Sequence, residues 1–528
     1  MPLHGKNFIG GQISARGSDT FQPVNPATGE KLEPVYFEAR EDEISQAAES
    51  AALALEERHY NDLEQNAALL ELIAIEIEAL GDRLLERAHL ETALPLARLA
   101  SERQRTVNQL RLLAGVAREG SWVDARIDRA IPGRTPQPKP DLRRMLVPIG
   151  AVAVFGAGNF PLAFSVAGGD TASALAAGCP VVVKAHPSHP GTSELTARAV
   201  QKALADASMP EDWFSMVHSA DPAASLFLVQ LPAIRALAFT GSQKAGKALF
   251  DAAMARAEPI PVYAEMGSVN PLFLLPGAMA ESAESLAAGI HHSVTLGVGQ
   301  FCTNPGLVVA IDGEPLERLL EGLRAAVRQT PPCSMLSQRI SRAYAAGVER
   351  LASTDGVELL ANSPVDPEPD KAEGAAMVFA TDAQTFLDRK QLHAEVFGPA
   401  TLVVRCQNLE EMLDVAAGLE GQLTATVHAT PTELAMNGEL LHILQSKAGR
   451  LIANGFPTGV EVSPAMHHGG PYPATTDIRA TSVGTAAILR FARPVCYQDF
   501  PEAVLPPELR DQNVRGIWRM IDGVWGKQ

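Results

Sequence analysis

Two residues of this chain could together carry out covalent chemistry on a carbonyl group. Cys302 stands in the run GQFCT, and Glu265 begins the run EMGSVNP. A thiolate is a strong nucleophile, and a carboxylate can activate the water that later removes an acyl group from it. The small and polar neighbours of Cys302 favour a loop that offers backbone N–H groups to an oxyanion. The pair predicts thioester chemistry.

Asn159 is a third candidate, because its side-chain amide could also hold an oxyanion. It lies in the run FGAGNFP, whose glycines form only part of a GxGxxG pattern. Taken alone, each of the three has a plainer interpretation. Cys302 could be a buried apolar side chain, Glu265 a solvated carboxylate and Asn159 a turn residue.

Two further segments have the residues of a phosphate or ribose site. The run FTGS, which ends at Ser242, joins a predicted strand to a predicted helix, where backbone N–H groups can hold a phosphate. A plain turn with Ser242 as N-cap explains it equally well. Lys184 closes a strand of valines, and ligands bind at such strand ends in α/β sheets. A solvated strand end is the alternative.

The hydrophobic periodicity predicts an α/β fold. Three helices come first, and four prolines then predict an extended connection over 131–140. Short strands then alternate with helices from 149 to about 257, which predicts βαβ units and a parallel sheet. A second alternation runs from 263 to about 454. The predicted early helices are 42–57, 64–90 and 96–118, with another over 163–177, and the clearest later strands are 270–275, 307–311, 400–404 and 485–491.

Length, charge and cysteine spacing disfavour several classes of function. A chain of 528 residues should form two or three domains. A net charge of −17 disfavours nucleic-acid and anionic-membrane binding. The N-terminus has no apolar signal region, and the five cysteines are scattered without metal-ligand spacing. We therefore expect a cytoplasmic protein with no metal site.

As a set, these motifs resemble the aldehyde dehydrogenase superfamily over nearly the whole chain. The run EVFGP, which begins at Glu395, completes the set. The resemblance implies that Cys302 attacks an aldehyde, that Asn159 and the Cys302 N–H hold the oxyanion, and that Glu265 activates water. It also implies an NAD(P) cofactor. The implied cofactor-binding residues are Lys184, Gly241, Ser242, Gly267, Glu395 and Phe397.

The chain departs from the family pattern at two positions. Ser268 replaces the usual second glycine after the catalytic glutamate. Pro187 stands where many NAD-preferring members have a glutamate that grips the ribose hydroxyls. Without that carboxylate a 2′-phosphate is not repelled, so NADP is the preferred prediction over NAD. Lys184 and His186 could strengthen that preference.

The runs around 155–171 and 455–474 resemble one branch, the α-ketoglutarate semialdehyde (2,5-dioxovalerate) dehydrogenases. That branch implies oxidation of the semialdehyde to 2-oxoglutarate. A substrate carboxylate calls for a bidentate arginine, and Arg98, Arg103 or Arg105 could supply it, although a salt-bridged helix face explains them too. An NADP-dependent long-chain fatty aldehyde dehydrogenase is the alternative, and a non-redox thiol esterase or acyl transferase is a remote one.

The resemblance implies a three-part architecture. A Rossmann-like cofactor-binding domain is expected over 1–124 and 148–262, and an α/β catalytic domain over 263–475. Residues 125–147 and 476–528 are expected to form a β-strand bridge that pairs with another subunit. A homodimer or homotetramer is the expected assembly, and a small aldehyde is the expected partner.

Overall fold

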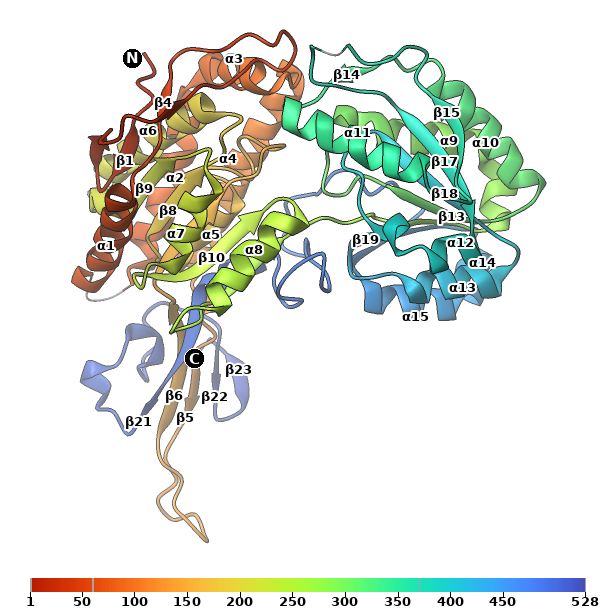
Figure 1. Ribbon diagram of the computed structural model, residues 1–528. Helices are drawn as coiled ribbons and strands as arrows, with labels where there is room; N and C mark the ends of the chain where they lie inside the picture. The colour runs from red at the N-terminus through yellow and green to blue at the C-terminus, as the bar shows by residue number, and fades with distance from the viewer. Residues whose placement is uncertain (1, 59–60, 369, 528) are drawn as a thin grey trace.

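The computed structural model describes residues 2–58, 61–368 and 370–527. It places them in two α/β domains with a smaller β-sheet that projects from the first domain (Figure 1). Within these ranges, no helix is both long enough and apolar enough to cross a membrane.

A seven-stranded sheet forms the centre of the first domain, in the order β11-β10-β7-β8-β9-β1-β2. The five strands from β11 to β9 are parallel, which confirms the predicted βαβ pattern, and β1 and β2 add an antiparallel edge. The strands are β1 (Asn7–Ile9), β2 (Gln12–Ser14), β7 (Ala151–Phe155), β8 (Val181–Ala185), β9 (Phe214–His218), β10 (Ile234–Thr240) and β11 (Val262–Glu265). Glu265 thus belongs to the first sheet.

Helices cover both faces of this sheet, because successive strand residues point to opposite sides. Val152 and Val154 pack into one apolar layer, whereas Ala151, Ala153 and Phe155 pack into the other. The first layer contains α2 (Leu63–Ala79), α3 (Gly81–Thr92), α4 (Leu96–Glu119), α5 (Gly169–Ala177) and α6 (Pro190–Asp206). The second contains α1 (Glu41–Glu57), α7 (Pro222–Gln230) and α8 (Gln243–Met254).

Two predicted helices are shorter than expected. The helix predicted over 64–90 is divided into α2 and α3 at Gly81, which has a left-handed φ of +58°. The helix predicted over 163–177 begins only at Gly169. Residues before it form a loop in which the Gly169 N–H donates to the Ala163 carbonyl oxygen at 3.0 Å. A Cβ on Gly168 would lie 2.5 Å from that oxygen, so this close approach requires glycine.

The second domain has its own seven-stranded sheet, in the order β15-β17-β18-β13-β12-β19-β20, in which only β15 is antiparallel to its neighbour. Its strands are β12 (Leu272–Leu274), β13 (Leu307–Ile311), β15 (Glu358–Asn362), β17 (Met377–Asp382), β18 (Ala400–Cys406), β19 (Gln422–His428) and β20 (Ala448–Ala453). One face carries α9 (Pro276–Thr295) and α10 (Glu314–Val327). The other carries α11 (Gln338–Ala352), α12 (Ala383–Asp388), α13 (Leu409–Gly418), α14 (Pro431–Met436) and α15 (Gly438–Lys447).

The projecting sheet has the order β21-β6-β5-β22-β23 and joins the predicted bridge to the C-terminal segment. Its strands are β5 (Arg126–Asp128), β6 (Leu142–Pro148), β21 (Ala492–Gln498), β22 (Arg519–Ile521) and β23 (Val524–Gly526). The proline-rich segment 131–140 is the tip of the β5–β6 hairpin, where Ile131 pairs with Lys139. Two small pairs complete the strands: β3 (Thr20–Phe21) with β4 (Tyr36–Phe37), and β14 (Cys333–Ser334) with β16 (Glu373–Gly374).

The strand predicted over 485–491 is wrong. Thr485–Phe491 is a 3₁₀ helix, and the strand β21 begins only at Ala492. Ala487, Ile488 and Phe491 are buried, and the last two join the apolar layer that contains α5. This spacing is that of one side of a helix rather than the two-residue period of a strand. Packing against α5 therefore decides the conformation.

Candidate active site

Segments from both domains bring the predicted catalytic residues together. Glu265 is the last residue of β11, and Cys302 follows the short 3₁₀ helix Leu296–Gly299 in the second domain. The chain after β20 returns to the first domain, where Thr475 forms a β-bridge with Glu265. This returning segment carries His468 into the site.

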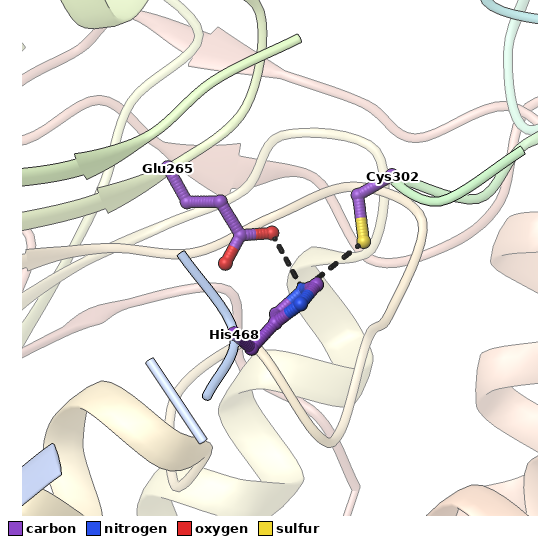
Figure 2. A group of neighbouring side chains, drawn as sticks. All are labelled: Glu265, Cys302 and His468. Atoms are coloured by element: carbon purple, nitrogen blue, oxygen red, sulfur yellow. Dashed lines mark hydrogen bonds and ion pairs between the residues drawn. The ribbon is translucent and has the colours of Figure 1, made fainter. Parts of the chain in front are cut away.

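His468 lies between the nucleophile and the carboxylate (Figure 2). Its Nε2 is 3.4 Å from Cys302 Sγ and 3.0 Å from Glu265 Oε1. Ser482 Oγ donates to the other carboxylate oxygen, Oε2, at 2.6 Å. His468 and Glu265 are almost fully buried, whereas Cys302 is partly exposed. The three side chains form a Cys–His–Glu arrangement.

The electrostatics of this group favour a neutral thiol beside an ionised carboxylate. Burial raises the pKa of Glu265, but the His468 imidazole and the Ser482 hydroxyl more than offset it, so the pKa lies below its ordinary value. Burial and the Glu265 charge hold the pKa of the Cys302 thiol well above its ordinary value. The thiol therefore needs a proton acceptor when it attacks.

Sequence reasoning missed the role of His468. Its run, MHHGGPYPA, falls within 455–474, where the sequence indicates a resemblance and no catalytic role, and it lies 166 positions from Cys302. The two adjacent histidines were the available signal, but nothing in the local pattern says which one faces the thiol. The tertiary structure shows that His468 is the histidine that faces the thiol. The segment that returns to the first domain places it beside Glu265, the last residue of β11.

The Asn159 side chain reaches the nucleophile loop. Its Nδ2 donates to the backbone carbonyl oxygen of Gln300 at 3.1 Å. On the opposite side of the loop, Asn270 Nδ2 donates to the carbonyl oxygens of Cys302 at 2.8 Å and Asn304 at 3.0 Å. Amide side chains thus hold the backbone of the nucleophile loop at Gln300 and at Cys302. The predicted oxyanion role of Asn159 is compatible with this placement.

Helix α4 presents two of the three candidate arginines to this loop. Arg98 donates to the Asn159 carbonyl oxygen at 2.8 Å, and its guanidinium lies over the Phe160 and Phe301 rings, 5.1 and 4.7 Å from their centroids. Arg105 lies over the Phe164 ring at 5.0 Å.

Between these arginines, Glu102 is almost fully buried and fixes the loop that carries Asn159. Its Oε1 accepts hydrogen bonds from the backbone N–H groups of Leu162 at 2.8 Å and Ala163 at 3.0 Å. Burial raises the pKa of Glu102.

Arg103 is a different case. Its guanidinium donates to the carbonyl oxygen of Gly81, at the start of α3. At about 100° per residue, Arg98 and Arg105 share one face of α4, whereas Arg103 lies well around the helix from both. Among the three candidates, the helical geometry therefore favours Arg98 and Arg105 over Arg103.

Two arginines carry positive charge toward the thiol. Burial lowers the pKa of Arg105, and the charges of Glu102, Cys302 and Glu265 oppose that effect. Burial likewise lowers the pKa of Arg450, which the charge of Cys302 opposes. Arg450 also donates to the carbonyl oxygens of Pro457 at 2.8 Å and Gly459 at 3.1 Å, and sequence reasoning missed it.

The predicted phosphate and ribose residues lie at the carboxyl ends of β8 and β10, the two strands that flank β7 in the first sheet. Lys184 pairs with Phe155 near the end of β8, and Ser242 caps α8, where its Oγ accepts from the Ala245 N–H at 3.4 Å. Gly241 and Ser242 are exposed, as a ligand site requires, and the Thr240 hydroxyl beside them is buried without a partner within the described residues. These features fit a bound dinucleotide.

The surroundings of Lys184 are mixed in charge. Burial lowers its pKa to about 8, while Glu38 raises it and Arg339 lowers it further. Burial also holds the pKa of His186 well below its ordinary value, so this imidazole adds no positive charge. Pro187 and Arg339 line a cavity of about 230 Å³.

The EVFGP loop packs directly against the catalytic segments. A Cβ on Gly267 would lie 2.3 Å from Glu395 Oε2, and a Cβ on Gly299 would lie 2.2 Å from the Gly398 carbonyl oxygen. Glycine is required at Gly299, whose φ is +66° and whose close neighbour is backbone, whereas at Gly267 the close atom is the mobile end of the Glu395 side chain. Burial raises the pKa of Glu395 to about 7. Phe397 lines the same pocket as Glu395.

Ser268, at the position where the family usually has glycine, has a structural role here. Its hydroxyl donates to Gln422 Oε1 at 2.8 Å and accepts from the Leu423 N–H at 3.0 Å. The serine therefore ties the segment after Glu265 to β19. Glu265 still contacts His468 although serine replaces glycine at position 268.

The fold and this site define a class of thiol-dependent oxidoreductase, and comparisons with known proteins agree. The sequence model that describes the aldehyde dehydrogenase family matches residues 13–474. The chain belongs to this family and is an oxidoreductase that acts on aldehydes.

Two curated bacterial proteins are similar over almost their full lengths. The alpha-ketoglutaric semialdehyde dehydrogenase 2 of Azospirillum brasilense is 49% identical over 524 residues, 99% of each chain. The alpha-ketoglutaric semialdehyde dehydrogenase of Acinetobacter baylyi is 43% identical, covering 99% of this chain and 98% of the relative. Among solved structures, a mutant aldehyde dehydrogenase from Bacillus cereus shares the fold, with a TM-score of 0.79 at 22% identity, over 94% of this chain and 96% of its own.

Proposed function

We propose that the protein oxidises α-ketoglutarate semialdehyde to 2-oxoglutarate, with NADP preferred over NAD. The names of the two similar bacterial proteins support this substrate. The observation that carries it is Arg105, whose guanidinium lies 5.0 Å over the Phe164 ring and whose charge interacts with that of Cys302. A guanidinium is the group that best binds a substrate carboxylate.

The residues of the site support each step of the reaction. His468 Nε2 takes the proton of the Cys302 thiol as the sulfur attacks the aldehyde carbon. The Asn159 amide and the Cys302 N–H stabilise the oxyanion of the resulting thiohemiacetal. A nicotinamide cofactor bound at the predicted phosphate and ribose residues would supply the hydride acceptor for the thiohemiacetal carbon, and Cys302 would then hold the acyl group as a thioester. Glu265 then takes a proton from water, whose attack releases the carboxylate.

Lys184 and Arg339 support the preference for NADP, because both could face a 2′-phosphate and no carboxylate stands at position 187. Glu38 is the opposing charge nearby. On this proposal, Gly241 and Ser242 meet the pyrophosphate and Glu395 holds the nicotinamide ribose, with Gly267 and Phe397 beside it.

The substrate test compares Arg105→Met with Arg103→Met, a matched control on the same helix. We expect Arg105→Met to lower kcat/KM for the semialdehyde roughly 100-fold, about 2.7 kcal/mol, because one charge-assisted contact is lost. Activity on an uncharged aldehyde of similar length should change little, and Arg103→Met should behave as wild type. Equal losses on both aldehydes would overturn the proposed role of Arg105.

Oxidation of long-chain aliphatic aldehydes is the less favoured alternative. An alkyl chain beside Arg105 and Arg450 would cover the remaining exposed parts of their guanidinium groups without adding a counter-charge, which is costly. Higher kcat/KM for a long aliphatic aldehyde than for the semialdehyde would favour that alternative.

We further propose that the protein forms a homodimer or homotetramer through its projecting sheet. The strand β21 lies at the edge of this sheet, with free backbone groups that could pair with another subunit. Light scattering on wild type and on a Cys496→Pro variant tests this, because the alternation of the β21–β6 hydrogen bonds leaves the Cys496 N–H on the outer edge of β21. An unchanged assembly in the variant would count against β21.

A further inference from the structure

We propose that Glu265, Cys302 and His468 form a Zn²⁺ site, and that a bound Zn²⁺ reversibly inactivates the enzyme. Each residue offers one ligand atom, and these three atoms all lie within 4.8 Å of one another. Figure 2 shows the carboxylate and the sulfur converging on the His468 ring. The inference concerns this side-chain cluster and does not depend on the proposed substrate.

The distances are close to those of a tetrahedral site. Ligand atoms around Zn²⁺ should be separated by roughly 3.4–3.6 Å, given usual Zn–S, Zn–N and Zn–O bond lengths. Cys302 Sγ is 3.4 Å from His468 Nε2, which is 3.0 Å from Glu265 Oε1. The Sγ–carboxylate separation, at most 4.8 Å, needs to close by about 1 Å. Only small side-chain rotations are required.

The donor types select the metal. A thiolate and an imidazole favour Zn²⁺ over Mg²⁺ and Ca²⁺, which require oxygen ligands. With three protein ligands, the fourth position remains open to water on the side from which Cys302 is exposed. The sequence predicts no metal site because the three ligands come from segments far apart in the chain, so no spacing motif marks them.

A second observation concerns two buried polar atoms of the cluster. Glu265 is only 4% exposed, yet within the described residues no hydrogen bond reaches its Oε1, despite the 3.0 Å approach to His468. His468 Nδ1 also has no hydrogen-bond partner in that part of the chain. Since a zinc-bound imidazole usually donates its second N–H, we expect weaker binding than at a structural zinc site.

Binding replaces the S–H bond of Cys302 with a Zn–S bond and releases the thiol proton to solvent. The metal-bound sulfur is then unavailable to attack an aldehyde, while the water-activating carboxylate and the imidazole are held by the same ion. No oxidation is involved, so a chelator should restore activity completely.

Co²⁺ is the probe for this site, because thiolate ligation gives a near-ultraviolet charge-transfer absorption that can be read without substrate. Wild type should bind one Co²⁺ with this band, and Zn²⁺ should displace it. Cys302→Ser should abolish the band, and His468→Gln should weaken binding at least tenfold. The readout is independent of aldehyde oxidation, so its failure is distinguishable from failure of the proposed function.

Matched controls separate this site from other thiols and imidazoles. Cys333 and Cys496 are exposed, and His467 is the neighbour of His468. The variants Cys333→Ser, Cys496→Ser and His467→Gln should bind Co²⁺ and respond to Zn²⁺ as wild type does. A charge-transfer band that survives Cys302→Ser, or no binding by wild type at equimolar metal, would overturn the proposal.

Discussion

Replacing His468 by glutamine tests whether its imidazole accepts the proton of the nucleophile. Glutamine keeps a polar side chain of similar reach but cannot take a proton at neutral pH. In the wild-type protein Nε2 is 3.4 Å from Cys302 Sγ, while burial and Glu265 hold the pKa of the thiol well above its ordinary value. The variant should therefore attack aldehydes slowly.

The expected size of the loss follows from the geometry. A positioned general base contributes roughly 10²- to 10⁴-fold to rate. Glu265 remains within 4.8 Å of the sulfur and can accept the proton less directly, so we expect a loss near the lower limit. That limit is about 100-fold, or about 2.7 kcal/mol in the barrier for thiol attack.

Two measurements isolate this step. Single-turnover formation of the reduced cofactor reports attack and hydride transfer, and alkylation by iodoacetamide reports thiol reactivity without aldehyde. Both should slow in His468→Gln and remain normal in His467→Gln. If both rates stay within threefold of wild type while only steady-state turnover falls, His468 acts on the water step through Glu265, and the reasoning about the thiol proton is refuted.

Two further outcomes are expected. Lys184 has a pKa lowered to about 8, so its charge is present below that pH and lost above it. From about pH 7 to about pH 9 its charged fraction falls from about 90% to about 10%, so the KM for NADP should rise. In Lys184→Arg it should stay flat, and a wild-type KM that does not change would exclude a contact with the 2′-phosphate. The buried Asp170–Arg490 pair, with 2.7 Å between its atoms, should make Asp170→Asn about 3–5 kcal/mol less stable in urea unfolding. Arg479→Ala, which breaks an exposed pair with Asp477, should cost at most about 1 kcal/mol, and equal effects would contradict this account.

Local sequence was sufficient for much of the fold. The alternation of strands and helices predicted two α/β units, because periodicity depends only on neighbouring residues and the face they bury. Periodicity gave wrong predictions where contacts with distant segments outweigh the local preference of the chain. Thr485–Phe491 has the composition of a strand but forms a 3₁₀ helix against α5, and one predicted helix breaks at Gly81.

For the site, local sequence patterns were enough to predict which residue types could react and roughly which elements carry them. Cys302 and Glu265 were found because their local runs are unusual, and helical geometry placed Arg98 and Arg105 on one face of α4. The face of α4 that meets the thiol depends on tertiary packing. The contact between His468 and the nucleophile depends on it too. Reactivity depends on distances of a few ångströms between side chains from different segments. Folding of the whole chain sets these distances, and the local sequence around each residue contains no pattern that encodes them.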